Sequence, residues 1–378
     1  MPVYSSILAP YHLRDKSAPN RLAAQSMEIN SSGPSGSVSD AIIDRYRRLA
    51  EGRWGIVFVE AISVTPDSQA RTHSLVLNKG TVKGFKKLVE SFKSINPDAI
   101  IMFQLTHPGR LGGGFSRKVK VYGDDDQSHL LTEMEAGMLV EAFLEAVRLS
   151  AAAGADGVDI KACHGYLGGE FLRPLNRRDD RYGGSAENRA RFVSSILLQA
   201  RREFPRFILG TRVSLYEGIR GGCGTASPDE VIEDLNDIID TLGHLAGSGA
   251  DFFNVSAGIP RVTPQITRPQ AGSLPSLYHH FRYAKTVRRA FPGIAVIGSA
   301  YSSGREEGLP FAEENIARGY ADFAGFGRQN LADPLFPKKM LYGGGGADIC
   351  ILCGGCSLLL KEQKQVRCVK YDQRGAGL

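Results

Sequence analysis

Short apolar segments rich in β-branched and aromatic residues recur along the chain and alternate with longer segments whose apolar positions have a helical spacing. Several short segments are almost continuously apolar, which is typical of strands buried on both faces of a parallel sheet. The predicted strands span residues 22–27, 55–61, 99–104, 157–160, 207–213, 252–256, 295–298 and 323–327. Their alternation with helices predicts repeated βα units around a parallel sheet.

Eight strands alternating with eight helices over roughly 320 residues predict an α/β fold, the (β/α)8 TIM barrel, in which chemistry lies at the carboxyl ends of the strands. An open, doubly wound sheet is the alternative. Residues 105–131, 162–185 and 256–275 form the longest connections, and each follows the end of a predicted strand. Because long loops in a compact domain usually carry function, we expect active residues there.

Two helix starts carry capping signals. Thr132 is followed three residues later by Glu135, which is the pattern of a capping box. Ser227 precedes Pro228 and is followed three residues later by Glu230. We therefore predict that one helix begins after residue 132 and another after residue 227.

Composition and charge narrow the class of protein. The chain has 378 residues, of which 42% are hydrophobic and 23% charged, and these proportions exclude a disordered, collagenous or coiled-coil protein. The net charge of +6 is distributed among basic pairs interleaved with acids, so no basic face for nucleic acid is expected. The sequence contains no apolar run of membrane-spanning length, and residues 1–16 lack the features of a signal peptide. We therefore expect a cytoplasmic protein without a nucleic-acid or membrane partner.

Four of the six cysteines gather near the C-terminal end, at Cys350, Cys353, Cys356 and Cys368. In a long chain without a signal peptide, such a group indicates metal ligation more than disulfides. Four thiolates suit either tetrahedral zinc or an iron–sulfur cluster. Because the four glycines at 343–346 predict a flexible hinge, we divide the chain into a barrel over 1–342 and a metal-binding tail over 343–378.

The densest group of chemically active residues runs off the end of the fourth predicted strand. It reads Asp159-Ile160-Lys161-Ala162-Cys163-His164-Gly165-Tyr166-Leu167. Because strand ends meet at the mouth of a barrel, Lys161, His164 and Tyr166 would arrive there together. Taken alone, a histidine two residues from a tyrosine is more typical of a hydrogen-bonded pair in a protein core.

The motif continues downstream, and other segments match a known family in order along the chain. The downstream part comprises Phe171, Leu172, Pro174, Asn176, Arg178, Asp180, Tyr182-Gly183-Gly184-Ser185 and Asn188-Arg189. The further segments are Asn20-Arg21, Gln104-Leu105-Thr106-His107-Pro108-Gly109-Arg110, Arg212, Gly325-Phe326-Gly327-Arg328 and Ala332-Asp333-Pro334. With these residues the chain resembles the old yellow enzyme family of FMN-dependent ene-reductases, and the related 2,4-dienoyl-CoA reductases and amine dehydrogenases, over residues 7–378.

The resemblance implies an FMN-binding barrel, in agreement with the strand pattern. On matching positions, it implies that the isoalloxazine contacts Met27, Ala61, Gln104 and Arg212 and that the phosphate contacts Gly298, Gly327 and Arg328. Arg212 would place a permanent cation beside the N1 and C2 carbonyl region, where reduced flavin is negatively charged, and Gln104 could donate and accept at the pyrimidine edge. Glycine amides at a helix start, with Arg328 beside them, suit a phosphate.

The resemblance also assigns catalytic roles. His164 and Tyr166 match the positions that bind the substrate carbonyl and donate a proton. The family usually has histidine where this chain has Lys161, so the clamp on the substrate oxygen would be a lysine and a histidine. Alternatively, Lys161 pairs with Glu28. The resemblance places Glu28 in the flavin site, near N5 and the C4 carbonyl, where the family commonly has threonine, serine or cysteine. Glutamate cannot form the covalent flavin link of the amine dehydrogenases, so we expect non-covalent FMN.

These residues predict an oxidoreductase that reduces the activated carbon–carbon double bond of an enone, enoate or enoyl thioester. Two alternatives are open. The first is an amine dehydrogenase or demethylase on the same scaffold, and the second is an electron-transfer subunit whose flavin has no substrate of its own.

The tail cysteines resemble the [4Fe-4S] site that follows the barrel in dienoyl-CoA reductases and amine dehydrogenases, with structural zinc as the alternative. Family members with this cluster typically continue into a nucleotide-binding domain marked by Gly-x-Gly-x-x-Gly, and this sequence contains no such loop. We therefore expect a separate electron donor, such as a reductase subunit, a ferredoxin or a flavoprotein, or else a region of the protein outside this sequence. Whether the chain forms a homo-oligomer stays open.

Overall fold

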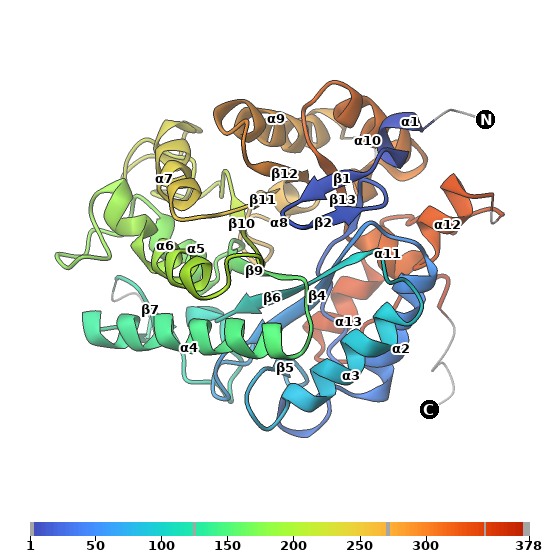
Figure 1. Cartoon of the computed structure of the whole chain (residues 1–378). Coiled ribbons are helices and arrows are strands. Elements are labelled where there is room, and N and C mark those ends of the chain that lie inside the picture. Colours follow the sequence, from blue (N-terminus) through green and yellow to red (C-terminus); the bar gives the residue numbers. More distant parts are fainter. Residues whose placement is uncertain (1–3, 124–125, 270–272, 344, 373–378) are drawn as a thin grey trace.

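The computed structural model of the chain describes residues 4–123, 126–269, 273–343 and 345–372 (Figure 1). Its centre is a ring of parallel strands: β3 (Leu22–Ala24), β4 (Ile56–Ser63), β6 (Ile100–Thr106), β9 (Gly157–Ala162), β10 (Ile208–Ser214), β11 (Phe252–Ser256), β12 (Ala295–Gly298) and β13 (Phe323–Phe326). Strand β3 pairs with both β13 and β4, which closes the ring. The predicted TIM barrel is therefore confirmed and the open sheet is excluded.

The eight predicted strands all occur, with ends that differ by a few residues. Nearly every residue of the ring strands is buried, because one side faces the barrel interior and the other side faces the surrounding helices. The largest difference is at β3, which ends at Ala24 although the predicted strand extends to residue 27. Met27 consequently lies in the loop that follows this strand.

Helices surround the ring and occupy the positions between successive strands (Figure 1). The main helices are α2 (Asp40–Glu51), α3 (Val82–Lys93), α4 (Glu133–Ala152), α6 (Ala186–Glu203), α7 (Asn236–Gly247), α9 (Leu274–Ala290), α10 (Gly308–Ala317) and α11 (Arg328–Ala332). Thr132 caps α4 through the Glu135 backbone N–H, and Glu135 binds the Thr132 backbone N–H in return. The capping box predicted at this position is confirmed.

The helix predicted to begin after Ser227 is absent, because α7 begins only at Asn236. The intervening residues form a turn that is bound to its surroundings. Asp229 pairs with Arg177 at 2.9 Å, and Gly221 N donates to the Glu230 carbonyl oxygen at 2.7 Å. The prediction was wrong because these tertiary contacts override the local capping signal.

The barrel interior has an apolar lower layer and a polar upper layer. Strands β1 (Tyr11–Leu13) and β2 (Lys16–Ala18) form an antiparallel hairpin, and Leu13 and Ala18 belong to the apolar cluster that fills the lower layer. Above this cluster, Gln25 and Asn254 exchange two hydrogen bonds of 2.8 and 2.9 Å across the barrel. The polar layer therefore forms the floor beneath any ligand that binds at the carboxyl ends of the strands.

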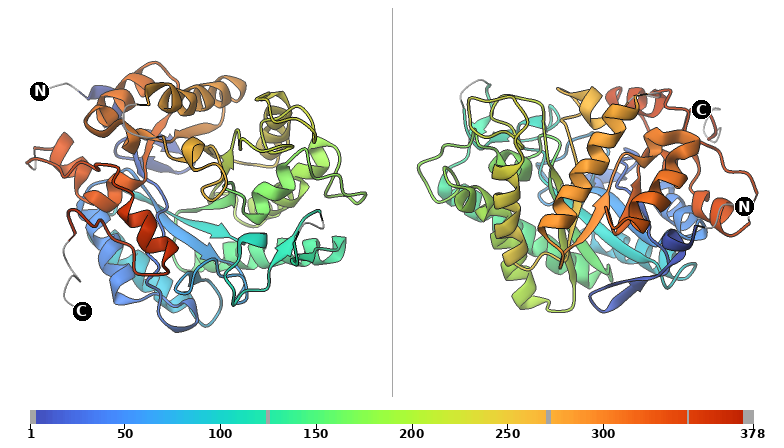
Figure 2. Two further views of the ribbon diagram at one scale, coloured as in Figure 1. Left: turned by 180° about the vertical axis from the view of Figure 1, so that it is seen from behind. Right: turned by 90° about the horizontal axis from the view of Figure 1, so that it is seen from above.

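The described part of the tail lies against the mouth of the barrel, with α13 (Gly355–Lys361) near the segment that follows β3 (Figure 2). Hydrogen bonds attach it. Cys350 N donates to Gln329 Oε1 at 2.9 Å, and Val366 N donates to the Ile29 carbonyl oxygen at 2.8 Å. The division between barrel and tail stays a prediction. Among the described residues, no helix is both long enough and apolar enough to cross a membrane.

Candidate active site

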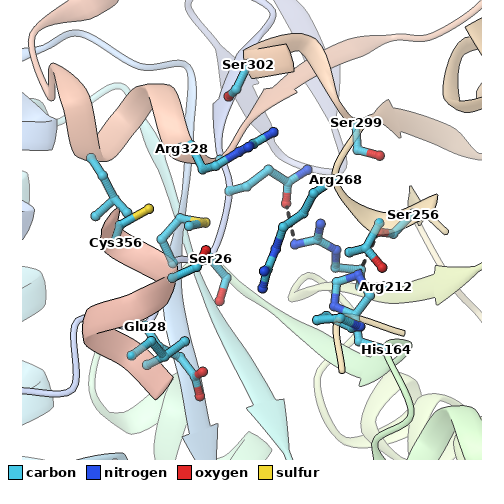
Figure 3. A pocket seen from close by; sticks show the side chains of 18 of the residues that line it. Ser26, Glu28, His164, Arg212, Ser256, Arg268, Ser299, Ser302, Arg328 and Cys356 are labelled. Carbon is cyan, nitrogen blue, oxygen red and sulfur yellow. Dashed lines mark hydrogen bonds between the residues drawn. The ribbon is translucent and has the colours of Figure 1, made fainter. Parts of the chain in front are cut away.

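An open cavity of about 1290 Å³, counted together with its mouth, lies at the carboxyl ends of the strands. The predicted site residues that line it are Met27, Glu28, Lys161, His164, Tyr166, Arg212, Gly327, Arg328 and Cys356. The structure therefore brings together residues from the beginning, middle and end of the chain (Figure 3). Ala61, Gln104 and Gly298 are not part of the lining, although all three are buried in the strands around it.

Gln104 is held below the cavity by two side chains. Its Nε2 donates to Asp159 Oδ2 at 2.8 Å, and its Oε1 accepts from Ser26 Oγ at 3.0 Å. Burial raises the pKa of Asp159, although Gln104 and Arg212 act in the opposite direction. With both ends of its amide engaged, Gln104 contributes to the polar layer beneath the cavity.

Arg212 forms the cationic part of the floor. Its Nη1 donates to Gln25 Oε1 at 3.1 Å, while its buried Nε has no hydrogen-bond partner among the described residues (Figure 3). The Gln25–Asn254 pair fixes this guanidinium and leaves part of its donor capacity unused. A fixed cation with unused donors fits the negatively charged edge of a reduced flavin.

A second part of the cavity is built for an anion. Arg328 Nη2 donates to Ser303 Oγ at 2.7 Å, and Ser299 and Ser302 line the same cavity. A Cβ atom at Gly327 would lie 3.2 Å from Met27 Sδ, so glycine keeps the backbone accessible there. These hydroxyls, the arginine and the glycine turn fit a flavin phosphate.

Sequence analysis missed the three serines of this anion site. A signal was present, because Ser299-Ala300-Tyr301-Ser302-Ser303 follows the seventh predicted strand directly. Hydroxyl-rich loops at that position of a barrel suit phosphate binding.

The three predicted catalytic residues come from one tight segment. Left-handed φ angles at His164 (61°) and Gly165 (79°) turn the chain sharply between β9 and α5 (Leu167–Leu172). The turn places the Lys161 Nζ 3.6 Å from the centre of the Tyr166 ring. It also brings His164 Nε2 within 2.8 Å of Ser256 Oγ at the end of β11 (Figure 3).

His164 is neutral near pH 7. Burial, followed by the positive charges of Arg212 and Lys161, holds the pKa of this imidazole well below its usual range. A neutral imidazole with Nε2 protonated can donate one hydrogen bond to an oxygen at the position of Ser256 Oγ.

Glu28 and Lys161 both line the cavity, but no ion pair joins them in the part of the chain that the structure describes. Instead, Lys161 lies over Tyr166, and the buried Oε1 of Glu28 has no hydrogen-bond partner there. The neighbouring Glu60 accepts a hydrogen bond from Ile29 N. Burial raises the pKa of Glu60 to about 8, which keeps this carboxyl largely protonated at neutral pH.

The four tail cysteines lie near one another without surrounding a single point. Cys356 and Cys368 both add to the effect of burial in raising the pKa of Cys350, so the three sulfur atoms are close enough to interact electrostatically. Within the described ranges, however, no group of three or more His, Cys, Asp or Glu side chains is placed to hold one ion. A single zinc ion would require such convergence at about 2.3 Å from each sulfur.

The remaining two cysteines fit the prediction of ordinary thiols. Burial raises the pKa of Cys163 to about 12 and that of Cys223 well above the usual range. Neither thiol is therefore ionised at neutral pH, and neither is activated as a nucleophile.

A closed barrel with a fixed guanidinium in the cavity floor and an anion site at the loops after β12 and β13 is the architecture of a barrel-type flavin oxidoreductase. Residues 6–344 match the family described as NADH:flavin oxidoreductase / NADH oxidase. The chain belongs to this family, and the predicted resemblance is confirmed. It is accordingly an oxidoreductase enzyme whose family uses FMN.

Individual relatives agree with this assignment. The chain is 30% identical to an NADPH dehydrogenase of Clostridium acetobutylicum over 341 residues, which cover 87% of this chain and 93% of the relative. It is also 30% identical to an NADH oxidase of Thermoanaerobacter brockii over 334 residues, 85% of this chain but only 48% of that protein. The chain therefore spans about half the length of the second relative.

A solved structure shares the fold over almost the whole chain. The 2-naphthoyl-CoA reductase in complex with 2-naphthoyl-CoA aligns with a TM-score of 0.87 and 22% identity, covering 99% of this chain and 58% of that one. The alignment includes the tail, which lies largely outside the family match.

Proposed function

We propose that the protein reduces an activated carbon–carbon double bond conjugated to a carbonyl group, as in an enone, an enoate or an enoyl thioester. The observation that carries the proposal is the grouping of Lys161, His164 and Tyr166 on one segment of the flavin cavity. FMN, when bound, supplies the hydride for such a reduction. The three side chains supply the polarisation and the proton.

His164 and Lys161 polarise the substrate. The neutral His164 donates through Nε2 to the carbonyl oxygen in place of Ser256 Oγ, which lies 2.8 Å away. Lys161 provides a positive charge on the same segment and favours the negative charge that develops on that oxygen.

Tyr166 donates the proton. Its side chain is buried except for 7% of its surface and lines the cavity, so the phenol can reach a bound substrate while bulk water is largely kept away. The Lys161 ammonium over its ring stabilises the negative charge that the phenol acquires as it gives up the proton.

Cys350, Cys353, Cys356 and Cys368 hold a [4Fe-4S] cluster in this proposal. Two observations support it: the cysteines lie near one another, and Cys356 lines the same cavity as Arg328. A [4Fe-4S] cluster binds one cysteine at each of its four irons, so its cysteine sulfur atoms lie farther apart than those around a single zinc ion. The cluster, when bound, would supply electrons singly from a separate redox partner, such as a reductase subunit, a ferredoxin or a flavoprotein.

The cavity favours double-bond reduction over both alternatives. Among the described residues of the lining, six side chains are cationic and Glu28 alone carries a carboxylate. An amine substrate would bring a further positive charge, and repulsion would weaken its binding. A pure electron-transfer subunit would have no need for the arrangement of His164, Lys161 and Tyr166.

Reoxidation of the flavin tests the proposed function. Protein reduced with dithionite under anaerobic conditions is mixed with enones, enoates and enoyl-CoA esters, and flavin absorbance is followed by stopped flow. Rapid reoxidation with formation of the saturated product is expected for at least one of these classes. If none of them reoxidises the flavin but amines reduce it, the direction of the proposed reaction is wrong.

A further inference from the structure

The cavity contains more positive charge than the flavin requires. Its cationic lining residues are Arg71, Lys161, Arg212, Arg261, Arg268 and Arg328, and Glu28 is the only acidic residue among the described residues of the lining. Arg212 and Arg328 fit the flavin ring and the flavin phosphate, and Lys161 lies over Tyr166. Arg71, Arg261 and Arg268 therefore remain without a role in the proposed reaction.

Arg268 is the most conspicuous of these three. It follows the short helix α8 (Pro264–Thr267) in the long loop after β11, and its side chain extends into the cavity between Arg328 and Arg212 (Figure 3). Only its backbone N–H has a hydrogen bond, to the Pro264 carbonyl oxygen, and its guanidinium has no ion pair among the described residues. Its positive charge therefore has no carboxylate partner among those residues.

The surroundings of Arg268 destabilise this charge. Burial and the positive charges of Arg328 and Arg71 lower the pKa of Arg268, against the opposite effect of Cys356. Arg268 in turn contributes to the low pKa of His164, so its charge reaches the substrate end of the cavity as well as the phosphate end.

Arg71 adds unused donors beside Arg268. Its Nη1 donates to the Ala70 carbonyl oxygen at 2.9 Å, and its buried Nε has no partner in the described part of the chain. Two neighbouring guanidiniums in one cavity, of which Arg71 keeps a free Nε donor, suit a carboxylate or phosphate.

We propose that Arg268 and Arg71 form an anion subsite that binds a carboxylate or phosphate group of the substrate. This inference rests on the proposed function and narrows its substrate class from activated alkenes in general to anionic ones. A bound anion would relieve the repulsion among the arginines, whereas a neutral enone would leave it in place. Flavin phosphate is a less suitable occupant, because Ser303, Arg328 and the Gly327 turn already provide its site.

Binding to the oxidised FMN-loaded protein tests the subsite without turnover. Three probes are titrated while the flavin absorbance is recorded: cinnamate, which carries a carboxylate; crotonyl-CoA, which carries phosphates; and benzylideneacetone, which is neutral. The variants are Arg268→Met and Arg71→Met, with Arg318→Met as a matched control, since Arg318 is exposed and pairs with Glu314. Arg268→Gln replaces Arg268→Met if the latter does not fold.

The dissociation constant of cinnamate or of crotonyl-CoA should rise about 10- to 100-fold in the Arg268 and Arg71 variants, the range for a lost charged hydrogen bond. FMN content and the affinity for benzylideneacetone should be unchanged in these variants. The Arg318→Met control should bind all three probes as the wild-type protein does. The anionic probe that is affected identifies the carboxylate or the phosphate as the recognised group.

Equal affinity of both anions in wild type and variants would overturn the subsite. Loss of FMN from folded Arg268→Met would also overturn it, because Arg268 would then belong to the flavin site. These outcomes are separate from those of the proposed function. Rapid reduction of benzylideneacetone with no arginine-dependent binding of either anion leaves double-bond reduction standing and removes the subsite. Arginine-dependent binding of an anion without reduction of any alkene would support the subsite and overturn double-bond reduction.

Discussion

The ammonium nitrogen of Lys161 lies 3.6 Å from the centre of the Tyr166 ring, and both side chains line the flavin cavity. This contact adds a third role for Lys161 to the two that the sequence suggests, a clamp on the substrate oxygen or a partner of Glu28. A cation over the face of a phenol ring is attracted by the ring and stabilises negative charge on the phenol oxygen. The relationship therefore connects the one unusual residue of the motif with the proposed proton donor.

The first prediction concerns Lys161→Met, which removes the charge and keeps an unbranched chain. If Lys161 acts through Tyr166, the rate of flavin reoxidation by the alkene should fall about 2- to 30-fold, corresponding to a cation–π contact of about 0.5–2 kcal/mol. A direct clamp on the substrate oxygen should cost more, about 100-fold or above. FMN content and the flavin potential should stay as in wild type.

A double-mutant cycle separates the two roles of Lys161. Lys161→Met is introduced into Tyr166→Phe, and the loss of rate is compared with that in the wild-type background. If the lysine acts through the phenol, the loss should largely disappear in the Phe background. If Lys161→Met lowers the rate equally in both backgrounds, Lys161 acts on the substrate. If Lys161→Met shifts the flavin potential, Lys161 acts as a partner of Glu28.

The second prediction concerns Tyr166→Phe, which keeps the ring and removes the acid. Reduction of the flavin should be unaffected, while alkene reduction should fall by about 100-fold or more, as expected for loss of a general acid. Stopped-flow measurement of the two half-reactions makes this comparison. Should reoxidation proceed at the wild-type rate, the proton comes from water or from another group.

The third prediction concerns the tail. Anaerobically purified protein should contain about four iron atoms with labile sulfide per chain. Cys353→Ser should lose the iron and retain FMN. Cys163→Ser changes a buried thiol outside the tail and should keep both. Iron, sulfide and flavin are measured in the wild-type protein and in the two variants. Zinc in place of iron in the wild-type protein would refute the cluster.

The fourth prediction concerns Glu60, which is 3% exposed and binds Ile29 N. Because burial raises its pKa from 4.5 to about 8, the folded protein holds this proton over a pH range in which the unfolded chain has released it. The free energy of unfolding should therefore decrease as the pH rises from about 4.5 to about 8, by at most about 5 kcal/mol. Above that range this contribution is constant.

Glu60→Gln keeps an acceptor for Ile29 N and has no charge to bury. The variant should gain stability relative to wild type at pH 9 and show little difference at pH 5, as measured by urea unfolding at both pH values. Glu51→Gln, at an exposed glutamate of α2, provides the control and should leave the wild-type pH dependence in place. The same pH dependence in Glu60→Gln would show that Glu60 is ionised in the native protein.

Local pattern was enough to predict the barrel. The eight apolar segments appear as the eight strands of the ring, because a strand buried on both faces needs the same continuous apolar run wherever it stands in the ring. The capping box at Thr132 could also be predicted from the sequence, because its two partners are only three residues apart. Nine of the predicted site residues line one cavity, and eight of them lie at or just after strand ends, which a barrel collects at one face.

Contacts between distant segments could not be predicted in this way. The helix expected after Ser227 gave way to the pairing of Asp229 with Arg177, 52 residues earlier. Arg71 and Arg268 carry no motif, and they meet only because the loops after β4 and β11 both reach over the mouth of the barrel. The orientation of Lys161 toward Tyr166 likewise depends on the sharp turn at His164 and Gly165, a backbone conformation that packing against the neighbouring strands imposes and that the residue types alone do not specify.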